Sequence, residues 1–303
     1  MELLSHFLLE TCQTFAPGLF FDLGLLRVTM SHALATPYLM YEILAFTALH
    51  QSRLRPAQAK ELQQEATSFQ TQALALFNNT AAEITADNCV PMLLYSSLLG
   101  KHMLADAINP PDGENQNFLD RLILSLEVHR GVRAVTASSW EIIGQSDIAP
   151  LLRASKQLPD GTSLSDFDHA RNECNALVDL LEVADLTQTC RDACTEALTT
   201  LRRVYNAKHY LGQSEDGFGM LFAWPVMLPA AFTDSLQKRN PEALIILAYY
   251  AVLLHSYRDN WIIGNAGEML IVSISSHLGS YWKRWLTWPT SALSTNTSSS
   301  EIL

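Results

Sequence analysis

The sequence predicts an all-α protein folded as a single irregular multi-helix bundle. Apolar residues recur at helical spacing along nearly the whole chain, and no period-two run is long enough to predict a strand. Breaks rich in Pro, Gly and Asn separate these stretches, as at residues 109–113 and 159–161. Short links between helices are typical of an irregular bundle rather than of a repeat array.

Composition supports a globular chain and excludes two classes of function. Of the 303 residues, 48% are hydrophobic and 17% are charged, which is unlike a disordered chain. The net charge of -11 disfavours direct binding to a phosphate backbone. The longest strongly apolar run, residues 243–254, is too short to cross a bilayer and indicates a buried core helix. The five widely spaced cysteines indicate reduced thiols in an intracellular compartment.

The first half of the chain predicts four long helices after a short N-terminal one. Pro37 suits the first turn of a helix, and Asn78-Asn79 and Asn109-Pro110-Pro111 are strong stops. The expected helices cover residues 38–54, 56–77, 85–107 and 117–137.

The second half predicts a pair of long helices, a polar Gly-rich link over 212–219, and a final group of helices. Pro225 and Pro241 each begin one of them. The expected helices cover residues 165–184, 187–211, 241–257, 260–277 and 282–288, with a short helix from Pro225. We expect one domain over residues 1–290 and a disordered Ser/Thr-rich tail over 291–303.

Several segments resemble one family along nearly the whole chain, in the same order. Residues 37–50 read PYLMYEILAFTALH, residues 88–99 form the next characteristic helix, and Arg130-Gly131-Val132-Arg133 precede Trp140. Later matches are Trp224-Pro225, residues 241–255, Trp261 and residues 285–289. This pattern resembles the C-terminal regulatory domain of fungal zinc-cluster transcription regulators of the sterol uptake control type. The resemblance implies a helical domain with an apolar central pocket for a sterol-like ligand.

The resemblance is incomplete at one module. Members of that family carry a six-cysteine zinc cluster with Cys-x2-Cys-x6-Cys spacing, and no such spacing occurs in these 303 residues. We therefore expect no contact with DNA through that module.

A second pattern indicates chemistry. Asn260, Gly264 and Glu268 are spaced four and four, which would place them on one helical face. The spacing resembles the second metal motif of class I terpene cyclases, where Mg2+ holds a diphosphate and promotes its ionisation. The alternative is that Asn260 caps the helix and Glu268 is a solvated surface residue.

A cyclase also needs a carboxylate that faces the first metal ligands and a cationic side chain that binds the diphosphate. Asp106, at the end of the helix before the Pro-Pro loop, is the candidate carboxylate, and Arg258 is the candidate cation, with Lys283 and Arg284 nearby in sequence. Asp106 could equally be an ordinary helix-end carboxylate, and Arg258 an ordinary surface charge. If the chain is such a cyclase, it resembles the fungal humulene synthases.

The leading hypothesis is a Mg2+-dependent cyclase of secondary metabolism that converts a prenyl diphosphate, with farnesyl diphosphate favoured, into a cyclic sesquiterpene. The alternative is a non-catalytic domain that binds a sterol-like lipophile and belongs to a transcription regulator. A third hypothesis is an interaction module that pairs with a full-length regulator, and a homodimer is also open to the chain. We expect a cytoplasmic location for the enzyme and a nuclear one for the regulator.

Overall fold

The prediction of an all-α fold is confirmed. The computed structural model describes residues 2–14, 23–80, 84–108, 118–149, 169–211, 218–219 and 221–295, and every regular element in these ranges is a helix. The chain divides into two compact units, one of Met1–Glu114 with Val128–Asp160 and one of Asn115–Glu127 with Gly161–Leu303. We describe each unit by itself, whereas the sequence predicts one domain over residues 1–290. Among the described residues, no helix combines the length and apolarity needed to span a membrane.

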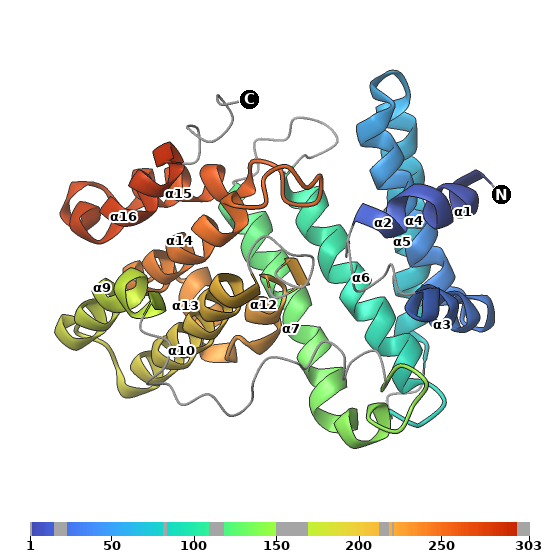
Figure 1. The fold of residues 1–303 in the computed structure, drawn as a ribbon, viewed down its shortest axis with the longest axis horizontal. Helices are drawn as coiled ribbons and strands as arrows, with labels where there is room; N and C mark the ends of the chain where they lie inside the picture. The colour runs from blue at the N-terminus through green and yellow to red at the C-terminus, as the bar shows by residue number, and fades with distance from the viewer. Residues whose placement is uncertain are drawn as a thin grey trace. The chain divides into compact units, whose positions relative to one another are not determined.

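The first unit is built on α4, which packs closely on α5 and contacts α3 and α6 (Figure 1). Thr36 is extended, and its carbonyl accepts hydrogen bonds from Leu39 and Met40, so α4 begins at Pro37 as expected. The elements of this unit are α1 (Glu2–His6), the π-helical turn η1 (Phe7–Thr11), α2 (Cys12–Thr14), α3 (Leu23–Ala35), α4 (Pro37–Leu54), η2 (Pro56–Gln58), α5 (Ala59–Asn78) and α6 (Cys89–Ile108). α7 (Phe118–Ile143) contributes to both units.

Two buried polar contacts tie the first unit together. On α6, His102 Nδ1 lies 2.9 Å from Oε1 of Glu42 on α4, and both side chains are buried. Burial raises the pKa of Glu42, and the nearby His102 opposes that rise.

His50 on α4 is the centre of the second contact. Its Nδ1 lies 2.9 Å from Thr11 Oγ1 and 3.3 Å from His6 Nε2. The wider π turn of η1 helps to bring His6 and Thr11 to the same ring.

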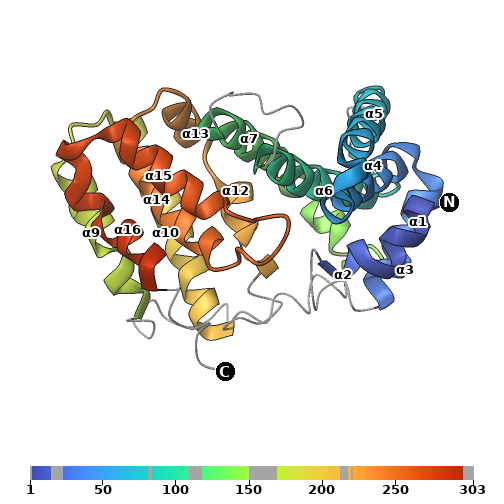
Figure 2. The same cartoon turned by 90° about the horizontal axis from the view of Figure 1, so that it is seen from above.

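The second unit surrounds α14, whose residues after Pro241 are all buried. α14 contacts α9, α10, α13, α15 and α16, and Figure 2 shows α15 and α16 beside it. Aromatic side chains support it: Trp224 stacks on Tyr250 with ring centroids 4.3 Å apart, and the Tyr205 hydroxyl donates to the Tyr249 carbonyl. The elements are α9 (His169–Val183), α10 (Gln188–Leu211), α12 (Ala223–Met227), α13 (Ala230–Gln237), α14 (Pro241–His255), α15 (Ala266–Leu278), η3 (Ser280–Trp282) and α16 (Lys283–Thr295).

Two of the predicted boundaries that differ from the structure affect the candidate sites. The helix expected over 260–277 is wrong in its first part, because residues 260–265 form turns and α15 begins at Ala266. The tail expected from residue 291 is wrong for residues 291–295, because α16 continues to Thr295. Residues 296–303, the rest of the expected tail, and the loops expected at 109–113 and 159–161 lie outside the described residues.

Gly267 sets the separation of α14 and α15. A Cβ atom at this position would lie 2.4 Å from the Ala251 carbonyl oxygen and 2.4 Å from the His255 backbone nitrogen. Any side chain would therefore push the two helix backbones apart, and only glycine permits this crossing.

We expect Gly267→Ala to lower the free energy of unfolding by about 1–3 kcal/mol, because the added methyl group overpacks two backbones rather than a movable side chain. Met269→Ala, on the exposed side of the same helix, should change the free energy of unfolding by less than about 0.5 kcal/mol. Urea unfolding followed by circular dichroism measures both values. Equal effects of the two variants would contradict the close crossing.

Stability should also fall on mild acidification because of His50. Burial, together with the neighbouring His6, lowers the pKa of His50 to about 4, from an ordinary value of 6.5. The unfolded chain therefore takes up a proton that the folded protein resists, and the unfolding free energy falls between pH 6.5 and pH 4.

At pH 5 this loss amounts to about 2 kcal/mol relative to pH 7.5. Urea unfolding at the two pH values measures it. His50→Gln should flatten the dependence, and His277→Gln, which removes an exposed histidine, should leave it unchanged. A slope that survives in His50→Gln would assign the pH dependence to other groups.

Candidate ligand-binding groove

The predicted metal face is not a helical face in the structure. Asn260 and Gly264 lie in the turns before α15, and Glu268 is an exposed residue in its first turn. The Asn260 carbonyl accepts the Gly264 N–H at 2.8 Å, and Gly264 then adopts a φ of 45°, which ends this turn. The side chain of Asn260 accepts the Ile262 N–H at 3.0 Å. Because the helix does not run through these residues, the four-and-four spacing does not align them.

Asp106 and Arg258 each have a local environment that explains them without catalysis. Asp106 is on α6 near Arg53, where its charge opposes the lowering of the Arg53 pKa by burial. Arg53 also donates to the Ala105 carbonyl at 3.2 Å. Arg258 follows α14, and its guanidinium lies 3.5 Å from the His255 carbonyl. Asp106 belongs to the first unit and Arg258 to the second.

The magnesium site stays a prediction that no comparison tests. Within the ranges that the structure describes, no group of three or more His, Cys, Asp and Glu side chains is arranged to hold a metal ion.

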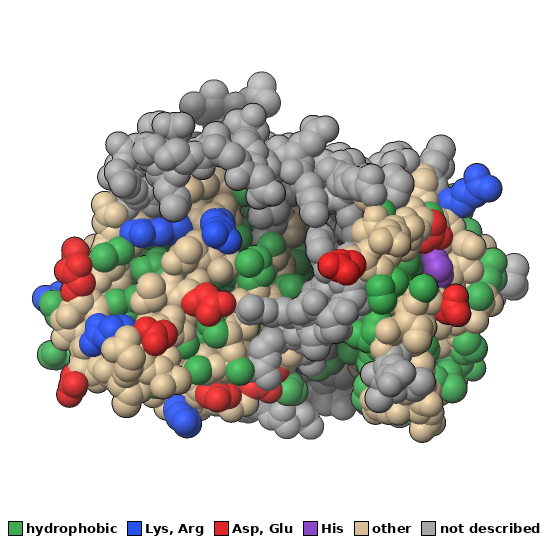
Figure 3. Space-filling model, turned by 90° about the horizontal axis from the view of Figure 1, so that it is seen from below, with side chains coloured by type: hydrophobic (Ala, Val, Ile, Leu, Met, Phe, Trp, Pro, Cys, Tyr) green, Lys and Arg blue, Asp and Glu red, His purple; other side chains and the backbone are tan. Residues whose placement is uncertain are grey.

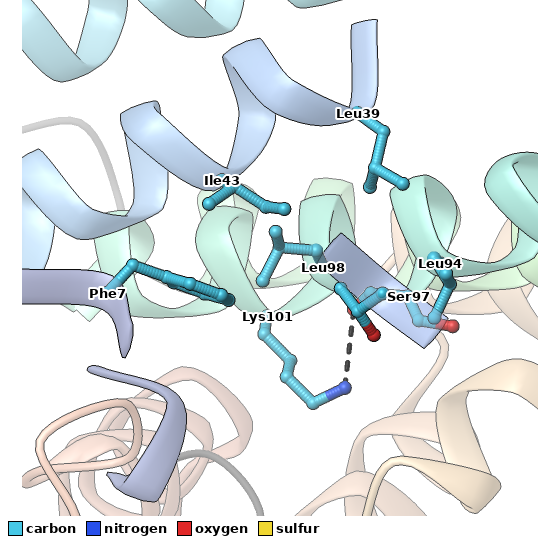
Figure 4. Close-up of a pocket in the computed structure, with 8 residues that line it drawn as sticks. Phe7, Leu39, Ile43, Leu94, Ser97, Leu98 and Lys101 are labelled. Carbon is cyan, nitrogen blue, oxygen red and sulfur yellow. Dashed lines mark hydrogen bonds between the residues drawn. The ribbon is translucent and has the colours of Figure 1, made fainter. Parts of the chain in front are cut away.

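A small cavity lies in the first unit, between η1, α3, α4 and α6. Its volume of about 30 Å³ has room for water but not for a lipophile. Figure 4 shows Lys101 extending from α6, with its amine directed to Ser97, whose carbonyl lies 3.4 Å from Nζ. Burial lowers the pKa of Lys101 to about 8. The other lining residues are Phe7, Thr29, Leu39, Ile43, Leu94 and Leu98.

A much larger groove lies in the second unit, between α15, η3 and α16. Its volume is about 490 Å³, within the range of roughly 300–1,000 Å³ that small-molecule sites occupy. We call it the α15–α16 groove. Its lining residues are Ile271, Val272, Ser275, Ser276, Gly279, Ser280, Lys283, Leu286, Thr290 and Leu293.

The turn at Gly279 forms this groove. Gly279 has a φ of 71°, and its N–H is donated to the Ser275 carbonyl at 3.1 Å, which ends α15. α16 then returns against α15 and supplies the opposite wall.

The lining combines apolar walls with a few polar groups. Ile271, Val272 and Leu286 contribute hydrocarbon, and Lys283 contributes one cation. The Ser275 hydroxyl is buried and has no hydrogen-bond partner among the described residues. Such a lining suits a molecule that is mostly hydrocarbon with one polar group.

Sequence reasoning missed this groove. It expects a central pocket and a tail from residue 291, whereas the groove lies between the last two long helices and includes Leu293. The signal in the sequence was the stripe of Ile271, Val272 and Ser275 on one predicted helix, but a stripe alone does not reveal that its partner helix leaves a gap.

Comparison with known proteins finds similarity to fungal transcription regulators. Residues 2–119 match the fungal specific transcription factor domain. Over 268 residues it is 24% identical to a Zn(2)-C6 fungal-type transcription factor of Gibberella zeae, a match that covers 83% of this chain and 52% of that protein. Over 260 residues it is 25% identical to Sterol uptake control protein 2 of Candida albicans, covering 80% of this chain and 35% of that protein.

These matches confirm the predicted resemblance to the C-terminal part of fungal transcription regulators. The chain spans about half the length of one relative and about a third of the other.

The leading hypothesis of a prenyl diphosphate cyclase is wrong. The domain match and both relatives point to transcription regulators and not to a lyase of secondary metabolism. The structure adds a physical reason, because the helical alignment of Asn260, Gly264 and Glu268 on which the hypothesis depended is absent.

Proposed function

We propose that this chain is the ligand-binding regulatory part of a fungal transcription regulator, acting in the nucleus, and that its ligand is a sterol-like lipophile held in the α15–α16 groove. The observation that carries the proposal is the similarity to Sterol uptake control protein 2 over four fifths of the chain. The volume and lining of the groove support it independently.

Burial of hydrocarbon supplies most of the affinity in such a site. Each Å² of apolar surface removed from water stabilises the complex by about 25 cal/mol, before the cost of immobilising the ligand. A ligand hydroxyl near Ser275 adds specificity, because it gives a partner to a buried hydroxyl that has none among the described residues. A pure hydrocarbon has no polar group to form a hydrogen bond with the Ser275 hydroxyl.

The ligand regulates by shifting an equilibrium rather than by reacting. It changes the output only if it binds one conformation of the regulator more tightly than another, and each tenfold preference contributes about 1.4 kcal/mol.

Surface charge favours a regulatory role over direct DNA contact. The chain carries a net charge of -11. On the face drawn in Figure 3, Lys and Arg side chains of the described residues are interspersed with Asp and Glu. An acidic, mixed surface repels a phosphate backbone.

Titration with the fluorescent sterol dehydroergosterol tests the proposal. We expect saturable binding by the purified chain. Val272, whose side chain is 53% exposed and lines the groove, is the position at which a larger side chain would fill the groove. Val272→Trp should raise Kd at least tenfold, because the indole fills the space that the ligand needs.

Met269→Trp is the matched control, since Met269 lies on the same helix, is 38% exposed and does not line the groove. It should change Kd less than twofold. Absence of saturable binding, or equal effects of the two tryptophans, would contradict the proposal.

A further inference from the structure

A second groove, in the first unit, has a different character. It lies between α1, the end of α4, η2 and α5, and its volume is about 430 Å³. Three glutamates line it, Glu2, Glu61 and Glu65, against one arginine, Arg55. We call it the acidic groove.

Arg55 does not balance the two glutamates of α5. Its guanidinium donates to Glu2 Oε1 at 2.7 Å, and this contact lowers the Glu2 pKa. Glu61 and Glu65 are exposed, are spaced i,i+4 on α5, and make no ion pair with another described residue. Like charges at this spacing destabilise a helix by about 0.2–0.5 kcal/mol. The helix dipole offsets this cost only at Glu61, which lies in the first turn of α5, whereas Glu65 lies beyond that turn.

Gln51 provides an independent sign of a ligand. Its side chain lines the acidic groove but is only 2% exposed, and its Nε2 has no hydrogen-bond partner among the described residues. A buried amide without a partner costs about 1–3 kcal/mol. A hydrogen-bond acceptor that enters the groove and pairs with Gln51 Nε2 would offset this cost.

The walls beside these polar groups are apolar. Leu62 and Phe69 lie on α5 and Leu44 on α4, and all three line the acidic groove. A ligand for this site must therefore offer a cation, a hydrogen-bond acceptor and a hydrophobic group together.

We propose that the acidic groove docks a basic peptide segment of a partner protein. A Lys or Arg side chain lies between Glu61 and Glu65, a peptide carbonyl accepts the hydrogen bond of Gln51 Nε2, and an apolar side chain packs on Leu62 and Phe69. A polyamine supplies the cation but no acceptor for the amide, so the combination fits a peptide better than a small cation.

A fluorescein-labelled peptide, Lys-Leu-Arg-Ala-Leu-Lys-Arg-Leu, provides the probe, and anisotropy measures its binding to the full chain. We expect saturable binding that weakens between about 50 and 200 mM salt, as charge pairing requires. The double variant Glu61→Gln/Glu65→Gln should raise Kd at least tenfold. Glu182→Gln/Asp234→Asn, which removes the same charge from exposed positions on α9 and α13, should change Kd less than twofold.

Gln51→Leu separates specific docking from general attraction to an acidic protein. It leaves the charge unchanged, and it should weaken the peptide about fivefold or more while urea unfolding shows no loss of stability. Equal weakening by the two double variants, unchanged binding by Gln51→Leu, or displacement of the peptide by equimolar spermine would overturn the proposal. So would a dimer of the free chain that Glu61→Gln/Glu65→Gln dissociates, because the groove would then be a contact between copies.

Discussion

The close approach of α15 to α14 at Gly267 is the constraint on which the second unit depends. α14 is buried over nearly its whole length, so the helices around it must pack against it on every side. At Gly267 the space between the helices is smaller than a methyl group. This fixes which face of α15 points inward, with Leu270, Ile271 and Ile274 buried and Val272 exposed. The outward side of α15 is then available to form one wall of a groove with α16.

The segment before α15 also bears on the choice between the proposed binding role and the cyclase hypothesis. Asn260 and Gly264 close a turn, and the left-handed backbone of Gly264 separates that turn from α15. The oxygen atoms proposed as magnesium ligands therefore have no common helical face, while hydrocarbon from α15 and α16 lines a volume suited to a small lipophile. The matched domain and both relatives point to transcription regulators rather than to a lyase. In the first unit the acidic groove offers charge and a buried amide, so the two units would recognise different chemistry.

The sequence predicted the fold class and most long helices, because periodicity and proline positions report on them directly. The starts of α4 and α14 follow from Pro37 and Pro241, since each proline occupies a first turn. Pro56 marks the end of α4, whereas no proline or glycine follows His255 closely enough to mark the end of α14. The turn at residues 260–265 could not be predicted, because its apolar residues, such as Ile262 and Ile263, are buried as they would be in a helix. The α15–α16 groove depends on the turn at Gly279 and on the continuation of α16 to Thr295, which are features that a helical pattern does not contain.

Hydrogen exchange with and without a sterol tests most directly whether a lipophile lies between α15 and α16. Peptides that cover residues 271–293 should exchange more slowly in the presence of ergosterol than with carrier alone, because the ligand holds the two helices together. Peptides from α4 and α5 should be unaffected. Unchanged exchange over 271–293 at saturating sterol, or protection confined to the first unit, would contradict the account.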